Sequence, residues 1–210
     1  MREQTANASV PFVAKLGMVD LGRPATYQDV IDAPEGVVAE LLDGGLYTQA
    51  RPRQRHRRIT MGLGTSLDGE FGDQLGKSGG WVFEPEPELH AESSVMVPDL
   101  AAWRVERYPH DLRDTVAIEV MPDWVCEVLS PSTAAKDRVL KLPRYGEAGV
   151  RWAWIVDPDL ETVEVYRRDE QGWVMITSVM GDAPARLPPF DSMALALGRV
   201  WPRSVADVPE

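Results

Sequence analysis

The sequence contains very little cysteine and no long apolar segment. One cysteine among 210 residues cannot form an intramolecular disulfide, so we expect a reducing compartment, the cytoplasm. The apolar patch near the N-terminus, residues 10–14, is too short and too closely flanked by polar residues for a signal peptide. No apolar run approaches the roughly 20 residues of a membrane helix. We therefore expect neither a disulfide-stabilised secreted domain nor a membrane protein.

Basic residues are also in the minority. The chain has 22 Lys and Arg against 33 Asp and Glu, which gives a formal net charge of −11. A protein that coats nucleic acid normally presents a basic face, so this balance argues against that class. It does not exclude an enzyme that binds DNA through a local basic patch. One such patch exists, because residues 51–58 read RPRQRHRR, with five arginines around His56.

The length and composition suit one globular domain. Apolar residues make up 44% of the chain and charged residues 26%, which are ordinary values, and this length can bury a substantial core. We expect a partly flexible leader at residues 1–22, a single domain at 23–203 and a tail at 204–210. Along the chain we expect a helix, a hairpin, a helix, strands, a helix and an antiparallel meander. The predicted fold class is therefore mixed α/β.

Local signals place these elements. A short helix is expected at residues 26–33, followed by a hairpin that turns at residues 43–45. Residues 79–89 and 94–104 each read as a strand, with Pro98 at an edge position or a bulge. An amphipathic helix begins near the arginine patch, since apolar residues recur at every fourth position: Ile59, Leu63, Leu67 and Phe71.

Residues 123–133, DWVCEVLSPST, place a carboxylate inside an apolar strand. Side chains alternate along a strand, so Glu127 faces away from its neighbours Cys126 and Val128. An ionised side chain in a buried strand is costly unless it is paired or holds a metal. Asp99 has a similar setting, between VMVP and LAAW. If Asp99 and Glu127 point the same way from neighbouring strands, they can share one divalent cation.

Such a cation would be Mg²⁺ or Mn²⁺. Mg²⁺ prefers one or two carboxylates together with waters and phosphate oxygens, and it activates water for phosphodiester hydrolysis. Asp99 could instead be a turn residue after proline, and Glu127 could face solvent or form a buried ion pair. Their apolar flanks favour the metal role for both. Glu40, beside the hairpin turn, is as consistent with a solvent-facing charge as with a site.

A helix is predicted to begin near residue 132. Asp137, Lys141 and Tyr145 fall four residues apart in it and share one face if the helix is continuous. Lys141 would then lie near Glu127, where it could orient the attacking water or stabilise charge on the phosphate. It could also pair with Asp137 on a solvated face. Because Pro143 removes a backbone hydrogen bond, we expect a kink or a break at residues 140–143.

Several stretches of the sequence, taken in order over about residues 24–200, carry a resemblance to one family. They are AELLDGGLY, RHRRI, EPEPEL, VPDLAAWR, PDWVCEVLSPST, DRVLKLPRY, AWIVDP and VEVY. The chain resembles a large bacterial family of restriction endonucleases, with activity that is largely inferred, in the PD-(D/E)XK nuclease superfamily. The resemblance implies a restriction-endonuclease-like core with a Mg²⁺ site: a mixed central sheet flanked by helices, here with an added antiparallel meander.

The resemblance also implies roles for individual residues. Asp99 matches the aspartate of the PD element and Glu127 the acid of the (D/E)XK element, so both would hold the metal, and Glu40 matches the acid upstream. The superfamily's lysine would fall at Leu129, and Lys141 is its displaced counterpart. Candidate supporting residues are His56, Asp137 and Tyr145, and candidate phosphate contacts are Arg53, Arg55, Arg57 and Arg58.

The sequence therefore predicts a Mg²⁺- or Mn²⁺-dependent endonuclease that hydrolyses DNA phosphodiester bonds with a metal-activated water, using Glu40, Asp99, Glu127 and Lys141. The alternative is a non-catalytic module on the same fold that binds nucleic acid or protein, or a structural homodimer formed through the meander. Leu129 and the acidic charge favour this alternative. The arginine run would then be a solvated or subunit-binding surface, and His56 a surface residue.

Overall fold

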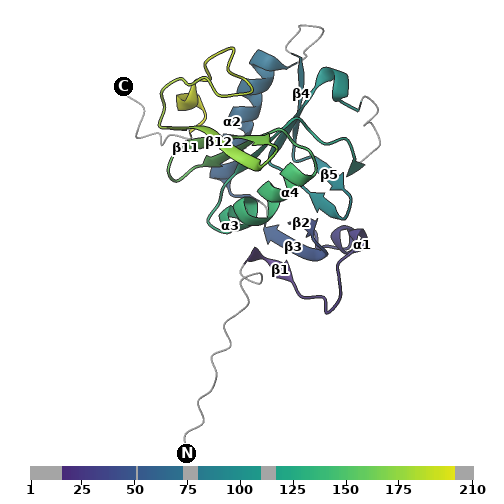
Figure 1. Cartoon of the computed structure of the whole chain (residues 1–210). Helices are drawn as coiled ribbons and strands as arrows, with labels where there is room; N and C mark the ends of the chain where they lie inside the picture. The colour runs from purple at the N-terminus through teal and green to yellow at the C-terminus, as the bar shows by residue number, and fades with distance from the viewer. Residues whose placement is uncertain (1–15, 51, 73–79, 110–116, 202–210) are drawn as a thin grey trace, which may run out of the picture.

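Two six-stranded sheets form the framework of the protein, which the computed structural model describes over residues 16–50, 52–72, 80–109 and 117–201 (Figure 1). In the first, the central sheet, β9 and β10 run parallel and the other neighbours run antiparallel. Its strands, in spatial order, are β12 (Gly172–Met180), β11 (Thr162–Asp169), β10 (Trp152–Asp157), β9 (Trp124–Val128), β7 (Leu100–Arg104) and β4 (Trp81–Pro85). The predicted mixed α/β class and the meander β10–β11–β12 are confirmed.

The second sheet contains the predicted hairpin. Its strands, in spatial order, are β1 (Met18–Val19), β3 (Gly45–Ala50), β2 (Val37–Leu42), β6 (Ser94–Met96), β5 (Glu88–Ala91) and β8 (Ala117–Ile118). The turn between β2 and β3 has φ of 52° at Asp43 and 74° at Gly44, the left-handed values that tight hairpins require. β1 pairs with β3, so the folded part extends into the predicted leader. Residues 1–15 of that leader and the predicted tail lie outside the described residues.

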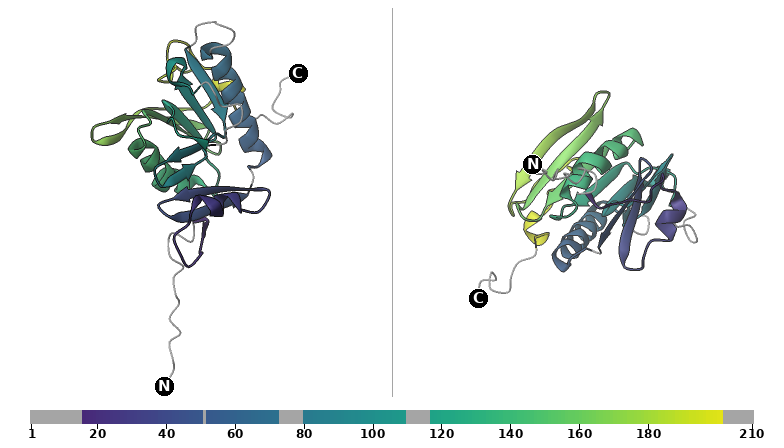
Figure 2. Two further views of the ribbon diagram at one scale, coloured as in Figure 1. Left: turned by 90° about the vertical axis from the view of Figure 1, so that its right-hand side faces the viewer. Right: turned by 90° about the horizontal axis from the view of Figure 1, so that it is seen from below.

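Helices cover both faces of the central sheet. Figure 2 shows α2 (Gln54–Phe71) on one face, and on the other the helical run of α3 (Ala134–Lys136), η3 (Asp137–Lys141) and α4 (Leu142–Glu147). The shorter helices are α1 (Tyr27–Ile31), η2 (Val105–Arg107) and η4 (Leu197–Arg199). Within the described ranges, no helix combines the length and the apolar character needed to cross a membrane.

The side chains of β9 alternate between two parts of the core. Cys126 and Val128 belong to the cluster that includes the buried α2 residues Ile59, Leu63, Leu67 and Phe71. Val125 belongs to the cluster on the opposite face, together with Tyr145 of α4. The alternation predicted from the sequence is therefore present, and it directs Glu127 toward the helical run.

The chain passes from one sheet to the other near two prolines. Each of the two predicted strands, at residues 79–89 and 94–104, is in fact a pair of strands in different sheets: β4 and β5 are interrupted before Pro87, and β6 and β7 at Pro98. Proline has no N–H to donate to a strand ladder, which is why pairing stops there. The prediction of single strands was wrong in this respect, and Asp99 consequently lies at the junction between the sheets.

The packing of α2 makes a stability prediction. Leu63 is fully buried, whereas Met61, two residues earlier on the same helix, is 74% exposed. Leu63→Ala should lower the free energy of unfolding by about 2–5 kcal/mol through lost burial and a residual cavity. Met61→Ala should change it by no more than about 0.5 kcal/mol. Urea unfolding followed by tryptophan fluorescence measures both, and equal effects would contradict the observed orientation of α2.

Candidate active site

Asp99 lies where the chain enters the central sheet. Leu100 pairs with Cys126 in the β7–β9 ladder, and this register brings Asp99 beside the end of β9. There its Oδ2 accepts a hydrogen bond from the backbone N–H of Val128 at 2.7 Å and lies 3.1 Å from His56 Nε2. No hydrogen bond from a described residue reaches Oδ1. Asp99 is thus fixed through one oxygen and keeps the other available.

Glu127 is fixed in the same manner from the helical side. The Tyr145 hydroxyl donates a hydrogen bond to Oε1 at 2.6 Å, and Lys141 Nζ lies 2.8 Å from the same oxygen. The side chain is only 5% exposed. The ion pair and the hydrogen bond offset the cost of a carboxylate in a buried strand. Oε2 receives no hydrogen bond from any residue that the structure describes, so Glu127 also keeps one oxygen available.

An irregular helical turn brings Lys141 to this position. The backbone N–H of Leu142 donates to the carbonyl of Asp137, five residues back, so η3 is a π-helical turn. Pro143 follows in the first turn of α4, a place where its missing N–H costs little. The irregularity expected near Pro143 is therefore present, but the helical run continues through it. Asp137, Lys141 and Tyr145 all become buried, so Lys141 does not lie on a solvated face.

Glu40 links the two sheets through buried ion pairs. Its side chain is completely buried on β2, where Oε2 is 2.5 Å from Lys136 Nζ and Oε1 is 2.9 Å from Lys141 Nζ. Oε1 also accepts the backbone N–H of Val97 at 2.9 Å. Glu40 is therefore not a solvent-facing hairpin charge, which was one of the two readings of the sequence. It compensates the charge of two lysines.

The three acceptors around Lys141 use its full hydrogen-bonding capacity. Its ammonium has three N–H groups, and Nζ lies 2.9 Å from Glu40 Oε1, 2.8 Å from Glu127 Oε1 and 2.8 Å from the Val97 carbonyl. The two carboxylates outweigh the effect of burial and raise the pKa of Lys141 well above its ordinary value. Lys141 is therefore charged and holds Glu127 in place.

The carboxylates near Glu127 repel one another. Burial, together with the charges of Asp137, Asp99 and Glu40, raises the pKa of Glu127 well above its ordinary value despite the opposing effect of Lys141. Burial likewise raises the pKa of Asp137 to about 6. Burial acts on Glu40 in the same direction, but the two lysines outweigh it and lower the pKa of Glu40 to about 2. Four carboxyl groups lie near two ammonium groups, and a cation bound there would favour the ionised form of Glu127 and Asp137.

Three of these carboxylates line one pocket of about 570 Å³. Asp99 and Glu127 line it from the ends of neighbouring strands, and Asp137 lines it from η3. His56 and the side chains of Arg53 and Arg55 also border it. Glu40 and Lys141 are not among the residues that line it and lie behind it. The pocket combines acids within it and arginines on its border.

The arginine patch is divided by α2. Arg53 and Arg55 border the acidic pocket, Arg57 lines a neighbouring hollow, and Arg58 lines a third hollow on another side of the helix. Arg55 donates a 2.7 Å hydrogen bond to Asp159, within an ion pair. The patch predicted as one cluster of phosphate contacts therefore faces several surfaces, because successive residues of a helix point about 100° apart.

Lys136 is a residue that the sequence analysis missed. It is 2% exposed and donates to Glu40 and, at 2.7 Å, to Gln49 Oε1. The only signal in the sequence was its place directly before Asp137, and a lysine near a helix start is far more often solvated than buried. Leu129, at the position where a lysine was expected, is 5% exposed and lies beside the pocket.

These observations agree with the comparisons with known proteins. A family model described as "Putative restriction endonuclease" matches residues 24–198, most of the chain. The chain belongs to this family. The resemblance inferred from the sequence stretches is thereby confirmed, with nearly the same boundaries. A search of curated proteins found no match.

A solved structure supports the same fold for this member of the family. A crystal structure described as "a putative nuclease belonging to DUF820", from Anabaena variabilis, superposes with a TM-score of 0.67. The two sequences are 22% identical, and the match covers 85% of this chain and 98% of the other. The likeness shows that both chains share a nuclease-like fold.

The buried ion pairs make a prediction about stability. Glu40→Gln should lower the free energy of unfolding by about 3–5 kcal/mol, because it leaves two buried ammonium groups without their shared counter-charge. Glu147→Gln removes one partner of a surface ion pair whose glutamate is 64% exposed, and should cost no more than about 1 kcal/mol. Denaturant unfolding at neutral pH measures the difference.

A second substitution separates charge from packing. Lys136→Met, added to Glu40→Gln, removes one unpaired ammonium and should restore part of the lost stability. If Glu40→Gln were as stable as the unmodified protein, or if Lys136→Met made it worse, Glu40 would not be compensating these lysines.

Proposed function

We propose that this protein is a metal-dependent endonuclease that hydrolyses DNA phosphodiester bonds with a metal-activated water. One observation carries the proposal. Asp99 and Glu127, at the ends of neighbouring strands, line the same pocket, and each has one oxygen fixed by the protein and one oxygen without a hydrogen bond from a described residue. Two such oxygens at one pocket would allow the pair to share a cation.

The chemistry of the side chains fits Mg²⁺ or Mn²⁺. No group of three or more His, Cys, Asp or Glu within the described ranges is arranged to hold a metal ion. Mg²⁺ commonly takes only one or two carboxylates and completes its coordination with waters and substrate phosphate oxygens. Asp99 and Glu127 would be its ligands, with Asp137 available nearby. When bound, the ion would lower the pKa of a water and polarise the phosphate.

The surrounding residues would hold the two carboxylates in position. His56 and the Val128 N–H orient Asp99, while Tyr145 and Lys141 orient Glu127. The sequence predicts that Lys141 positions the attacking water. Since all three of its N–H groups already point at protein acceptors, we propose that it acts through Glu127, with Glu40 and Lys136 supporting it from behind. In this role it is a positioning residue.

Cleavage of DNA tests the proposal. With Mg²⁺ or Mn²⁺ the purified protein should cut plasmid or linear duplex DNA, and chelation of the metal should stop it. Asp99→Asn and Glu127→Gln should each reduce the rate by about a hundredfold or more, the order of loss when a group that stabilises transition-state charge is removed. Glu170→Gln, an exposed carboxylate between β11 and β12, is the control and should retain full activity.

Metal binding gives a readout that does not depend on cleavage. Isothermal calorimetry with Mn²⁺ should detect a site in the unmodified protein and in Glu170→Gln, and should lose it in Asp99→Asn and Glu127→Gln. If the unmodified protein and the carboxylate variants gave the same background cleavage and the same heats, the assignment of both residues would be wrong.

A non-catalytic role on the same fold is the second candidate. Leu129 replaces the lysine expected of the superfamily, and Lys141 has no N–H free to contact a water in the pocket. A homodimer also stays a prediction, supported by the exposed apolar side chains of the outer strand β12: Val174, Met175 and Ile176. Binding without cleavage would favour this role, and light scattering would report the dimer.

A further inference from the structure

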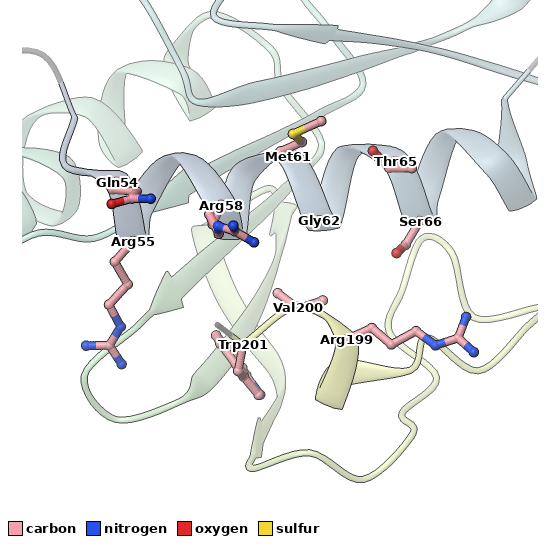
Figure 3. Close-up of a pocket in the computed structure, with 10 residues that line it drawn as sticks. All are labelled: Gln54, Arg55, Arg58, Met61, Gly62, Thr65, Ser66, Arg199, Val200 and Trp201. Carbon is pink, nitrogen blue, oxygen red and sulfur yellow. The ribbon is translucent and has the colours of Figure 1, made fainter. Parts of the chain in front are cut away.

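A long groove runs between α2 and the segment that contains η4. Figure 3 shows α2 as one wall, with Arg58 and Ser66 along it, and Arg199 and Val200 on the facing wall. The hollow measures about 1050 Å³. The two walls are close at Gly62, where an added β-carbon would lie 3.6 Å from Val200 Cα.

The charge of the groove is opposite to that of the protein. Three arginines line it, Arg55, Arg58 and Arg199, and no acidic residue is among its lining residues, although acids outnumber basic residues by 33 to 22 in the whole chain. Arg58 and Arg199 are exposed and make no ion pair or side-chain hydrogen bond with a described residue. Their charge is therefore free to meet an anion from outside.

The shape of the groove suits a chain of phosphates better than a single one. Along α2 from Gln54 to Ser66, polar lining side chains lie toward both ends, and Met61 and Gly62 lie between them. At 1.5 Å per residue, this length of helix spans roughly 18 Å, which is the length of about five base pairs at 3.4 Å each. Hydroxyl and amide groups are common phosphate contacts next to arginine. The donors on α2 are thus spread over a length that suits the phosphates of an extended polyanion.

The groove also meets the acidic pocket. Arg55 lines both of them, and Arg53 and His56 border the pocket from the same end of α2. A nucleic acid with its scissile phosphate near Asp99 and Glu127 would thus have a path past Arg55 into the groove. The pocket contains carboxylates as well as arginines, whereas the groove is lined by arginines without any acidic residue.

We infer that the groove between α2 and η4 binds the sugar-phosphate backbone of duplex DNA flanking the cleaved bond, with Arg58 and Arg199 as the phosphate contacts. The inference rests on the proposed function for the identity of the ligand, and it adds a binding surface outside the carboxylate pocket. Contacts of this kind position DNA without reading its sequence, so the binding should be strongly dependent on salt and only weakly dependent on sequence.

Binding of a fluorescein-labelled 20-base-pair duplex, measured by anisotropy without divalent metal, tests the inference. The double variant Arg58→Ala/Arg199→Ala should bind at least about tenfold more weakly at low salt. The slope of log K against log salt should fall by about 2, since each phosphate contact contributes roughly 0.9. The matched control is Arg151→Ala/Arg167→Ala, two exposed arginines in another hollow that also contains Asp169 and Glu170; it should retain the slope.

The outcomes separate this inference from the proposed function. If the unmodified protein does not bind the duplex, or if both double variants weaken binding equally, the groove is not the binding surface. If only the single strand of the same sequence binds, the assignment of a duplex is wrong. If the duplex binds through Arg58 and Arg199 but added Mg²⁺ or Mn²⁺ produces no cleavage, the assignment of the groove as a DNA-binding surface is upheld and the nuclease proposal is wrong. Thermal unfolding of both double variants shows that they are folded.

Discussion

The buried ammonium of Lys141 is the interaction on which the site depends. A charged group in the interior is stable only when its N–H groups are satisfied and its charge is compensated. Lys141 meets this condition with acceptors from three segments: Glu40 on β2, the Val97 carbonyl between the sheets, and Glu127 on β9. One side chain therefore connects the second sheet, the crossing between the sheets and the central sheet at a single point.

The local irregularities of the fold place the partners of this lysine. The π-helical turn before Pro143 keeps the helical run continuous while its polar residues face the sheet. Pro98 stops strand pairing after β6 and lets the chain change sheets, which brings Asp99 to the end of β9. Both prolines lack a backbone donor, and a charged side chain of the site lies close to each of them: Lys141 before Pro143 and Asp99 after Pro98. The irregular backbone near these two prolines therefore also helps to set the positions of the charged side chains in the site.

Helix α2 separates two electrostatic environments. On one side His56 supports Asp99 in a pocket with an excess of carboxylates, where a cation would be stabilised. On another side Arg58 faces a groove without acids, where an anion would be stabilised. A protein with net charge −11 can therefore offer a phosphate chain a favourable surface, because salt at about 0.1 M screens interactions between exposed charges beyond about 10 Å.

Pattern and chemistry in the sequence were sufficient for the fold class, the hairpin, the amphipathic α2, the alternation along β9 and the family. These features depend on residues close together in the chain, and the family stretches include Asp99, Glu127 and Lys141. Only the tertiary structure decided that Glu40 is buried, that Lys136 joins it, and that the arginines face different surfaces. Each of these outcomes depends on which residues, distant in the chain, come into contact on folding. A charged side chain can be buried only where such a residue supplies a partner for it. The sequence by itself indicated most of the charged residues of the candidate site, and the packing of two sheets added Lys136 and decided how the charges are paired.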